Sequence, residues 1–232
     1  DEKHGFYVDF YRSDNAISND YLYHNIGDSV ILYTQDGKVL KQDEVSSYPC
    51  VGEDLPGLRY FRSVRTTGLN ESTVVALFSA RLLNTGTSYM KMWIPASSDV
   101  SYFTALAPGA KTASSPYQSK PSLVVTMRKE KPAVKEPFVV VYEPISDELS
   151  ADLIESVDRI KLDPLGKESC AIKVKTKKGD TFTLVNILKD GPVILNNQKC
   201  CADFAIFAKR KGKNSVYVGN GSFVENKDFK IE

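Results

Sequence analysis

The sequence has few of the residues that most enzyme centres use. Its 232 residues include two histidines, one tryptophan and four cysteines. The cysteines are irregularly spaced and form no CxxC or HExxH pattern, so the sequence predicts no metal and no cofactor. Structural thiols are the favoured interpretation. Adjacent cysteines do not easily bond to each other, but a disulfide from Cys170 to Cys200 or Cys201 is a further hypothesis if their strands are neighbours.

The sequence also lacks long apolar runs and several well-known motifs. No run approaches the roughly 18 to 20 residues of a membrane helix, so no membrane span is expected. Nucleophile-elbow, Walker and dinucleotide-binding patterns are missing. The chain starts at Asp1 without a basic and apolar leader, which suggests a processed or artificial beginning.

The net charge of +1 argues against binding nucleic acid through bulk charge, but the charges are unevenly spread. Residues 1–60 contain eleven acidic and five basic residues, whereas residues 161–232 contain eight acidic and fourteen basic ones. The C-terminal part is therefore the basic part of the chain.

Short apolar segments separated by turn residues run through the whole sequence. Asp36-Gly37, Pro108-Gly109 and Lys211-Gly212 are typical turn pairs. This pattern predicts an all-β protein with little helix: a large antiparallel β-sandwich over residues 1–145 and a small β-domain over 146–232. The segment from Ser146 to Leu162 fits either two helical turns or a loop that leads into a strand at residues 157–162.

The stretch "NDYLYHNIGDSVIL" places polar and aromatic residues before an apolar strand. Strand alternation puts Tyr21, Tyr23 and Asn25 on one face and His24 on the other, beside Leu22. This favours a packed core or interface histidine. A catalytic histidine would need a hydrogen-bonding partner from an adjacent strand, and the candidates are Asp9, Asp20 and Arg12.

Two further patterns allow a structural or a binding interpretation. Tyr89, Lys91 and Trp93 share one strand face, which suits either packing, the favoured interpretation, or stacking on a sugar ring. The candidate glycan-binding residues are therefore Tyr21, Tyr23, Tyr89, Lys91 and Trp93. The lysines at 173, 175, 177 and the basic run at 209–213 fit a solvated strand face, or alternatively an electrostatic rail for an acidic polysaccharide.

The segment "FYVDFYRSDNAISNDYLYHNIGDSVIL" resembles part of the heparinase II/III-like polysaccharide lyases. In that family a "DxFR" strand precedes a polar turn and an "HDYxxH" strand. The matching residues are Asp9, Phe10, Tyr11, Arg12, Asn19, Asp20, Tyr21, His24 and Asn25. Asn19 replaces the first histidine of the pattern. The segments "MKMWIPASSDVSYFTALAP", "SLVVTMRKE" and "VYVGNGSFVENKDFKIE" resemble later elements of these lyases in order.

The resemblance implies the β-sandwich region of a secreted or periplasmic lyase that acts on an acidic polysaccharide such as a glycosaminoglycan. The catalytic groups of these lyases lie mainly on an N-terminal α/α toroid, which this chain lacks and would have as its partner. No catalytic residue is carried over, and His24 and Arg12 are the nearest weak candidates. The alternatives are a stand-alone carbohydrate-binding or cell-surface β-sandwich protein and a purely structural interaction module.

Overall fold

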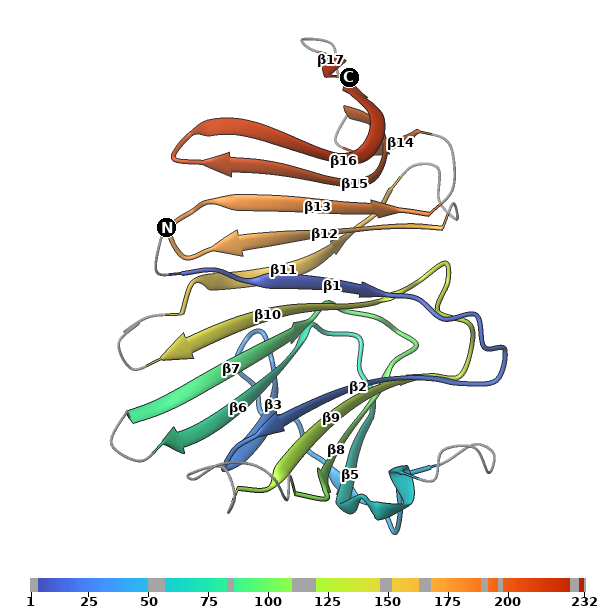
Figure 1. Ribbon diagram of the computed structural model, residues 1–232, viewed down its shortest axis with the longest axis vertical. Coiled ribbons are helices and arrows are strands. Elements are labelled where there is room, and N and C mark those ends of the chain that lie inside the picture. The colour runs from blue at the N-terminus through green and yellow to red at the C-terminus, as the bar shows by residue number, and fades with distance from the viewer. Residues whose placement is uncertain are drawn as a thin grey trace. The chain divides into compact units, whose positions relative to one another are not determined.

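The computed structural model describes residues 4–49, 57–82, 86–109, 120–146, 152–162, 168–188, 192–195, 198–225 and 230–231. The prediction of an all-β fold is confirmed: the described elements are strands in three antiparallel sheets, together with one short 3₁₀-helix, η1 (Leu58–Tyr60) (Figure 1). In this described part, no helix is long and apolar enough to cross a bilayer.

The first two sheets have five strands each. Sheet A has the order β1 (Tyr7–Tyr11), β10 (Phe138–Ser146), β7 (Gly86–Ile94), β6 (Val74–Leu82) and β3 (Ser29–Thr34). Sheet B has the order β2 (Asn19–Ile26), β9 (Ser122–Lys129), β8 (Ser101–Ala107), β5 (Arg62–Leu69) and β4 (Asp43–Glu44).

Sheet C has seven strands. Its order is β11 (Ile154–Ile160), β12 (Ser169–Thr176), β13 (Thr181–Ile187), β15 (Gln198–Arg210), β16 (Lys213–Glu225) and β17 (Lys230–Ile231), and β14 (Val193–Leu195) also pairs with β15.

The chain divides into two compact units. Unit 1 comprises residues 1–9, 15–132 and 138–152, and it contains sheet B and nearly all of sheet A. Unit 2 comprises residues 10–14, 133–137 and 153–232, and it contains sheet C. Residues 10–14 and 133–137, both within the predicted large sandwich of residues 1–145, therefore belong to unit 2. The predicted division into residues 1–145 and 146–232 is contiguous and assigns both segments to the first domain.

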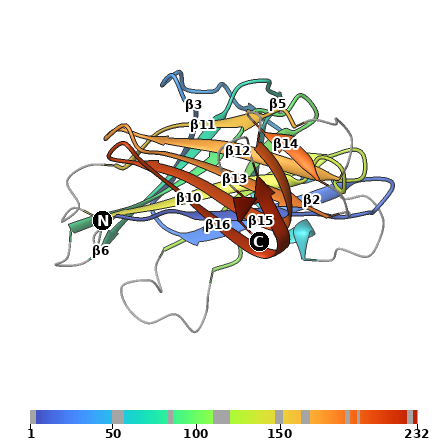
Figure 2. The same ribbon diagram turned by 90° about the horizontal axis from the view of Figure 1, so that it is seen from above.

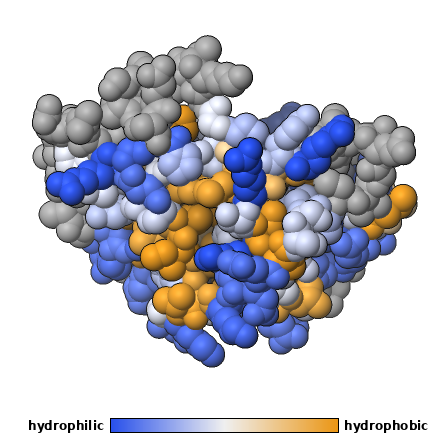
Figure 3. All heavy atoms as spheres, turned by 90° about the horizontal axis from the view of Figure 1, so that it is seen from below, coloured by the Kyte–Doolittle hydropathy of each residue, from blue (hydrophilic) through white to orange (hydrophobic). Residues whose placement is uncertain are grey.

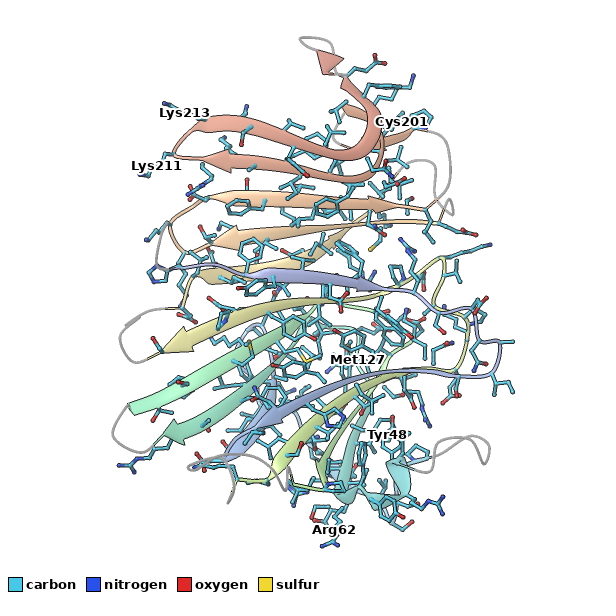
Figure 4. The ribbon with its side chains drawn as sticks, viewed as in Figure 1. Tyr48, Arg62, Met127, Cys201, Lys211 and Lys213 are labelled. Carbon is cyan, nitrogen blue, oxygen red and sulfur yellow. The ribbon has the colours of Figure 1, made fainter. Side chains whose placement is uncertain are left out.

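Unit 1 is a sandwich because one face of sheet B packs against one face of sheet A. The ring of Tyr23 on β2 packs against Phe78 of β6 and Tyr142 of β10, which places this face of sheet B against sheet A. Met127, which lies opposite Tyr21 on β9, is 1% exposed in the same layer (Figure 4). The other face of sheet B carries Leu22.

That outer face of sheet B has a small apolar cluster of its own. Tyr48 packs with Val64, Phe103, Ala105 and Val124, and η1 contributes Leu58. Tyr48 comes from the long connection between β4 and η1 (Figure 4). This connection therefore covers part of the face that carries Leu22.

Ion pairs lie at one end of the sandwich. Arg128 donates to both carboxylate oxygens of Asp20, at 2.7 and 2.6 Å, and its guanidinium stacks on Tyr48. The Lys129 ammonium, whose side chain is fully buried, lies 3.1 Å from Asp99. Buried charges persist in proteins only when they are paired in this way.

Unit 2 is built from hairpins with tight turns. Gly212 adopts a φ of 77° between β15 and β16, a conformation that glycine reaches at little cost. At Gly221 a Cβ atom would lie 2.3 Å from the Cβ of Ala202, so this position has no room for a side chain. The register between β15 and β16 shifts beside Ala202, and β16 bends there (Figures 1 and 2).

A core cluster of unit 2 is built from β12, β13, β14, β15 and β16 of sheet C. Val185, Val193, Cys200, Ala205 and Val224 are all fully buried within it. For the segment after Ser146, one of the two predictions was a loop that leads into a strand at residues 157–162. A strand is present there, β11, but it begins earlier and spans Ile154–Ile160. Residues 147–151, where the helical alternative would begin, lie outside the described residues.

Some large apolar side chains of unit 1 remain exposed, among them Ile31, Val39 and Leu69. In the view from below, apolar residues reach the surface between hydrophilic ones (Figure 3). Scattered apolar residues of this kind are normal on protein surfaces and do not by themselves define a binding site.

Candidate functional site

Three tyrosines meet in the layer between the two sheets of unit 1. The Tyr21 hydroxyl donates to the Asp9 carboxylate at 2.7 Å and lies 2.6 Å from the Tyr142 hydroxyl. Tyr23 contacts the Tyr142 ring, with 4.9 Å between centroids. Asn25 completes the row with a 3.4 Å hydrogen bond to the Tyr23 hydroxyl. The predicted glycan-binding residues Tyr21 and Tyr23 thus form an inter-sheet layer.

The environment of these tyrosines keeps them protonated. Burial raises the pKa of Tyr21, and its hydrogen bonds with Tyr142 and Asp9 raise it further. Burial also raises the pKa of Tyr23, partly offset by the hydrogen bond from Asn25, and it raises the pKa of Tyr142. At neutral pH each is therefore a neutral phenol that can donate a hydrogen bond but cannot act as a phenolate base.

His24 lies on the opposite face of β2, beside Leu22. Its ring packs edge-on against Phe61 with 6.1 Å between centroids, although the residue as a whole is exposed. Burial of the ring lowers the pKa of His24, so the imidazole is neutral at pH 7. Two of the predicted partners are engaged elsewhere: Asp9 accepts from Tyr21, and Asp20 accepts from Arg128.

Arg12, the third predicted partner, belongs to unit 2. Its Nη2 donates to the side-chain oxygen of Asn186 at 2.7 Å, and its Nη1 donates to the carbonyl of Val134. These bonds join the two short segments of unit 2 to sheet C. Burial lowers the pKa of Arg12, with a further lowering from nearby Arg159 that Cys170 and Glu168 oppose. The contacts of Arg12 are those of a residue that holds the fold.

Trp93 and Lys91 lie on the face of sheet A that points away from sheet B. The indole of Trp93 is 4% exposed, and its Nε1 donates to the buried Glu143 carboxylate at 3.0 Å. The Lys91 ammonium lies 5.5 Å from the centroid of the Trp93 ring and forms an ion pair with Asp152. Because so little of the indole is exposed, a sugar could stack on it only after the side chains that cover it had moved. The environment of Trp93 is therefore that of a packed core residue.

A pocket of about 390 Å³ lies within unit 1, where the ends of four strands meet. Tyr89 is the one predicted glycan-binding residue that lines it. The other lining residues are Gly5, Asn25, Ile26, Phe78, Ser79, Ala80, Ser88, Met90, Pro144, Ile145 and Ser146. They come from the N-terminal segment and from β2, β6, β7 and β10.

The walls of this pocket combine apolar and hydrogen-bonding groups. Phe78, Met90 and Pro144 provide apolar surface, and Asn25 and Ser88 provide polar atoms. Small-molecule sites have this character and volumes of about 300 to 1,000 Å³. The volume and lining of this pocket are therefore those of a site that can admit a small ligand. Sequence reasoning missed it because residues far apart in the sequence, on β6, β7 and β10, form it together.

The structure corrects the disulfide hypothesis. Cys170, Cys200 and Cys201 form no disulfide with one another. The reason is the strand order, because β13 lies between the strand of Cys170 and the strand of Cys200. Cys50 lies outside the described residues. Within the ranges that the structure describes, no group of three or more His, Cys, Asp or Glu side chains is arranged to hold a metal ion.

The structure is thus that of an all-β protein with a pocket of about 390 Å³ in unit 1. A comparison of the sequence with known proteins shows what the chain is similar to. The chain is 36% identical over 149 residues to the endo-acting ulvan lyase of Formosa agariphila. The match covers 62% of this chain and 18% of the length of that protein. The chain is thus related to part of a polysaccharide lyase and spans less than one fifth of it. No family model matches the chain.

Proposed function

We propose that the chain is a non-catalytic β-sandwich portion of a polysaccharide lyase of the heparinase II/III-like type. In this role it supports an α/α toroid that carries the reaction and lines one wall of the cleft for an acidic glycan. The observation that carries the proposal is the 36% identity to an ulvan lyase over 62% of the chain. The order of segments that resembles the heparinase II/III-like lyases supports the finer assignment.

The chemistry of the described residues agrees with a supporting role. Cleavage by β-elimination needs a base that removes the C5 proton of a uronate, an acid that protonates the leaving oxygen, and a group that neutralises the carboxylate. Tyr21, Tyr23 and Tyr142 are held protonated, and His24 forms no hydrogen bond with Asp9, Asp20 or Arg12. The pocket beside Tyr89 can bind a sugar without performing this reaction.

A second candidate is a carbohydrate-binding β-sandwich that works without a lyase domain, and the pocket favours it. The two candidates differ in the gene. A long helical region encoded before Asp1 supports the lyase portion, whereas a secretion signal directly before Asp1 supports the independent binding protein.

The experiment compares binding with cleavage on the chain itself. Ulvan and a panel of acidic and neutral glycans are titrated into the protein by calorimetry, and ultraviolet absorbance follows the release of unsaturated uronate. We expect binding without release. Tyr89→Ala and Asn25→Ala should weaken binding because both line the pocket, whereas Tyr60→Ala, an exposed tyrosine of unit 1 outside the pocket, should not. Rapid release of unsaturated product would refute the non-catalytic role.

A further inference from the structure

Two hairpin tips meet at one end of sheet C in unit 2. The turn after β12 and the turn after β15 are neighbours because β13 pairs with β15, with Thr181 opposite Lys209. The backbone N–H of Lys211 donates to the Asp180 carboxylate at 3.0 Å, which ties one turn to the other. Lys211 and Lys213 lie at the tip of the β15–β16 hairpin, at the opposite end of β15 from Cys201 (Figure 4).

These tips concentrate positive charge. Residues 173–180 and 209–214 contain eight basic residues and a single acidic one, Asp180. The adjacent strand β11 adds Glu155, which pairs with Lys175 at 2.8 Å, and Asp158, which lies opposite Lys173. The run at 209–213 alone contains four basic residues and no acidic one, and the Arg210 guanidinium lies 3.9 Å from the Asp180 carboxylate. We call this surface the basic tip.

The folded state places like charges side by side in the basic tip. Arg210 lies directly opposite Lys213 across the hairpin. Like charges opposite each other in a sheet destabilise it. A cluster that repels itself without a ligand is relieved when a polyanion neutralises it. The Arg210–Lys213 pair therefore does not itself stabilise the hairpin, although the Arg210 guanidinium also lies 3.9 Å from the Asp180 carboxylate.

The basic tip also has a regular row of polar groups. Lys175, Thr181, Lys209 and Asn214 lie opposite one another on four successive strands. The two lysines are two strand spacings apart, about 10 Å by the usual strand separation. This is similar to the length of two sugar rings in an extended glycan, so a chain with one acidic group per disaccharide can reach from Lys209 to Lys175, where it competes with Glu155. Thr181 and Asn214 add hydrogen-bonding groups for the hydroxyls of the sugars.

We propose that the basic tip of unit 2 is a second, electrostatic binding surface for an acidic polysaccharide, separate from the pocket of unit 1. It deepens the proposed function, on which it rests, by assigning a site that attracts and holds the anionic chain. Binding there depends on charge and therefore weakens as salt concentration rises.

The test compares two quadruple variants of the full chain. The tip variant replaces Lys209, Arg210, Lys211 and Lys213 by Gln. The control variant removes the same number of exposed charges from unit 1 by replacing Lys38, Lys41, Arg62 and Arg81 by Gln. Affinity for polygalacturonate is measured by calorimetry between about 50 and 200 mM salt, a range over which charge-driven binding to polyanions changes strongly. Dextran is the neutral glycan, and duplex DNA is the polyanion that is not a polysaccharide.

We expect the tip variant to bind polygalacturonate at least about tenfold more weakly at low salt, with a shallower salt dependence, while the control variant stays within about twofold of the parent. Thermal unfolding should show the tip variant to be no less stable than the parent, because it removes the repulsion between Arg210 and Lys213. A loss of binding with this result comes from the lost charges and not from unfolding.

The other outcomes separate the inference from the function on which it rests. If the tip variant binds polygalacturonate as the parent does, the basic tip is not a site, and the proposed function stands. If the parent binds DNA as tightly as polygalacturonate and the tip variant loses both, the assignment to polysaccharides is wrong. If the parent binds neither polygalacturonate nor dextran, nor the glycans tested for the pocket, both proposals fail.

Discussion

The carboxylate of Asp99 is expected to control the acid stability of unit 1. It lies 3.1 Å from the fully buried Lys129 ammonium and 3.0 Å from the Lys131 ammonium, and it also accepts a hydrogen bond from Ser97. Burial alone would raise the pKa of Asp99. The hydrogen bond from Ser97 and the two positive charges outweigh burial and lower the pKa to about 2, against 3.8 for an ordinary aspartate. We predict that Asp99→Asn destabilises unit 1.

Two arguments give the size of the effect. A pKa that falls from 3.8 to about 2 corresponds to roughly 2 kcal/mol at neutral pH, since each unit is worth about 1.4 kcal/mol. Removal of one partner from a buried ion pair costs about 3 to 5 kcal/mol. Because the Asp99 side chain is 17% exposed, we expect the lower end, about 3 kcal/mol. The folded-state pKa is depressed, so this stability is present above pH 4 and is lost as pH falls toward 2.

The assay uses the intrinsic fluorescence of Trp93, which is the single tryptophan of the chain and lies buried in unit 1. Urea unfolding of the parent and of Asp99→Asn is followed at several pH values from 7 downward. The parent should lose stability as pH falls through this range, and the variant should start lower and lose less. Asp43→Asn, which removes the partner of the exposed Lys41, is the control and should change little. Equal stability of Asp99→Asn and the parent at pH 7 would refute the reasoning.

Four further predictions concern other parts of the molecule. Trp93→Phe removes the hydrogen bond to buried Glu143 and should cost about 1 to 3 kcal/mol in urea unfolding followed by circular dichroism, and a smaller change would contradict the packing role. Gly221→Ala should destabilise unit 2 by at least about 1 to 3 kcal/mol, because the added methyl group overlaps β15, whereas Gly5→Ala, with open space around it, should be neutral in the same assay. Burial raises the pKa of Cys200 to about 11, so a thiol reagent at pH 8 should modify it slowly in the folded protein and quickly after denaturation, without prior reduction. His24→Ala should change the free energy of unfolding by less than about 0.5 kcal/mol and leave glycan binding intact. A loss of binding would show that the glycan site lies on the outer face of β2 and not in the pocket.

Local sequence signals were sufficient for the type of secondary structure. The alternation of residues 21–25 correctly separates the tyrosine face from the face of Leu22 and His24, because a strand turns successive side chains to opposite sides. The turn at Lys211-Gly212 was predicted from its composition and is present, with positive φ at both residues. Such features depend on neighbours in the sequence and are readable there.

Features that depend on distant residues were not readable. The addition of residues 10–14 and 133–137 to unit 2 depends on Arg12, which bonds to Asn186 across 174 residues of sequence. Alternation put Trp93 on a face of its strand but could not show that Glu143 lies beside it on β10. The pocket likewise exists only because β6, β7 and β10 end together. Pairing of distant strands decides these features, and a single sequence contains no local signal for it.

The distribution of polar groups in unit 1 explains why binding and not catalysis is the role that we propose. A side chain that removes the C5 proton of a sugar must be accessible, deprotonated and held in place by a second group. The tyrosines between the sheets are well held, but burial keeps them protonated. His24 is accessible and neutral, but Asp9 and Asp20, the carboxylates that could orient it, already bind Tyr21 and Arg128. None of these candidates meets the three conditions together, whereas a glycan wall requires only a shaped surface with hydrogen-bonding groups, which the pocket beside Tyr89 provides.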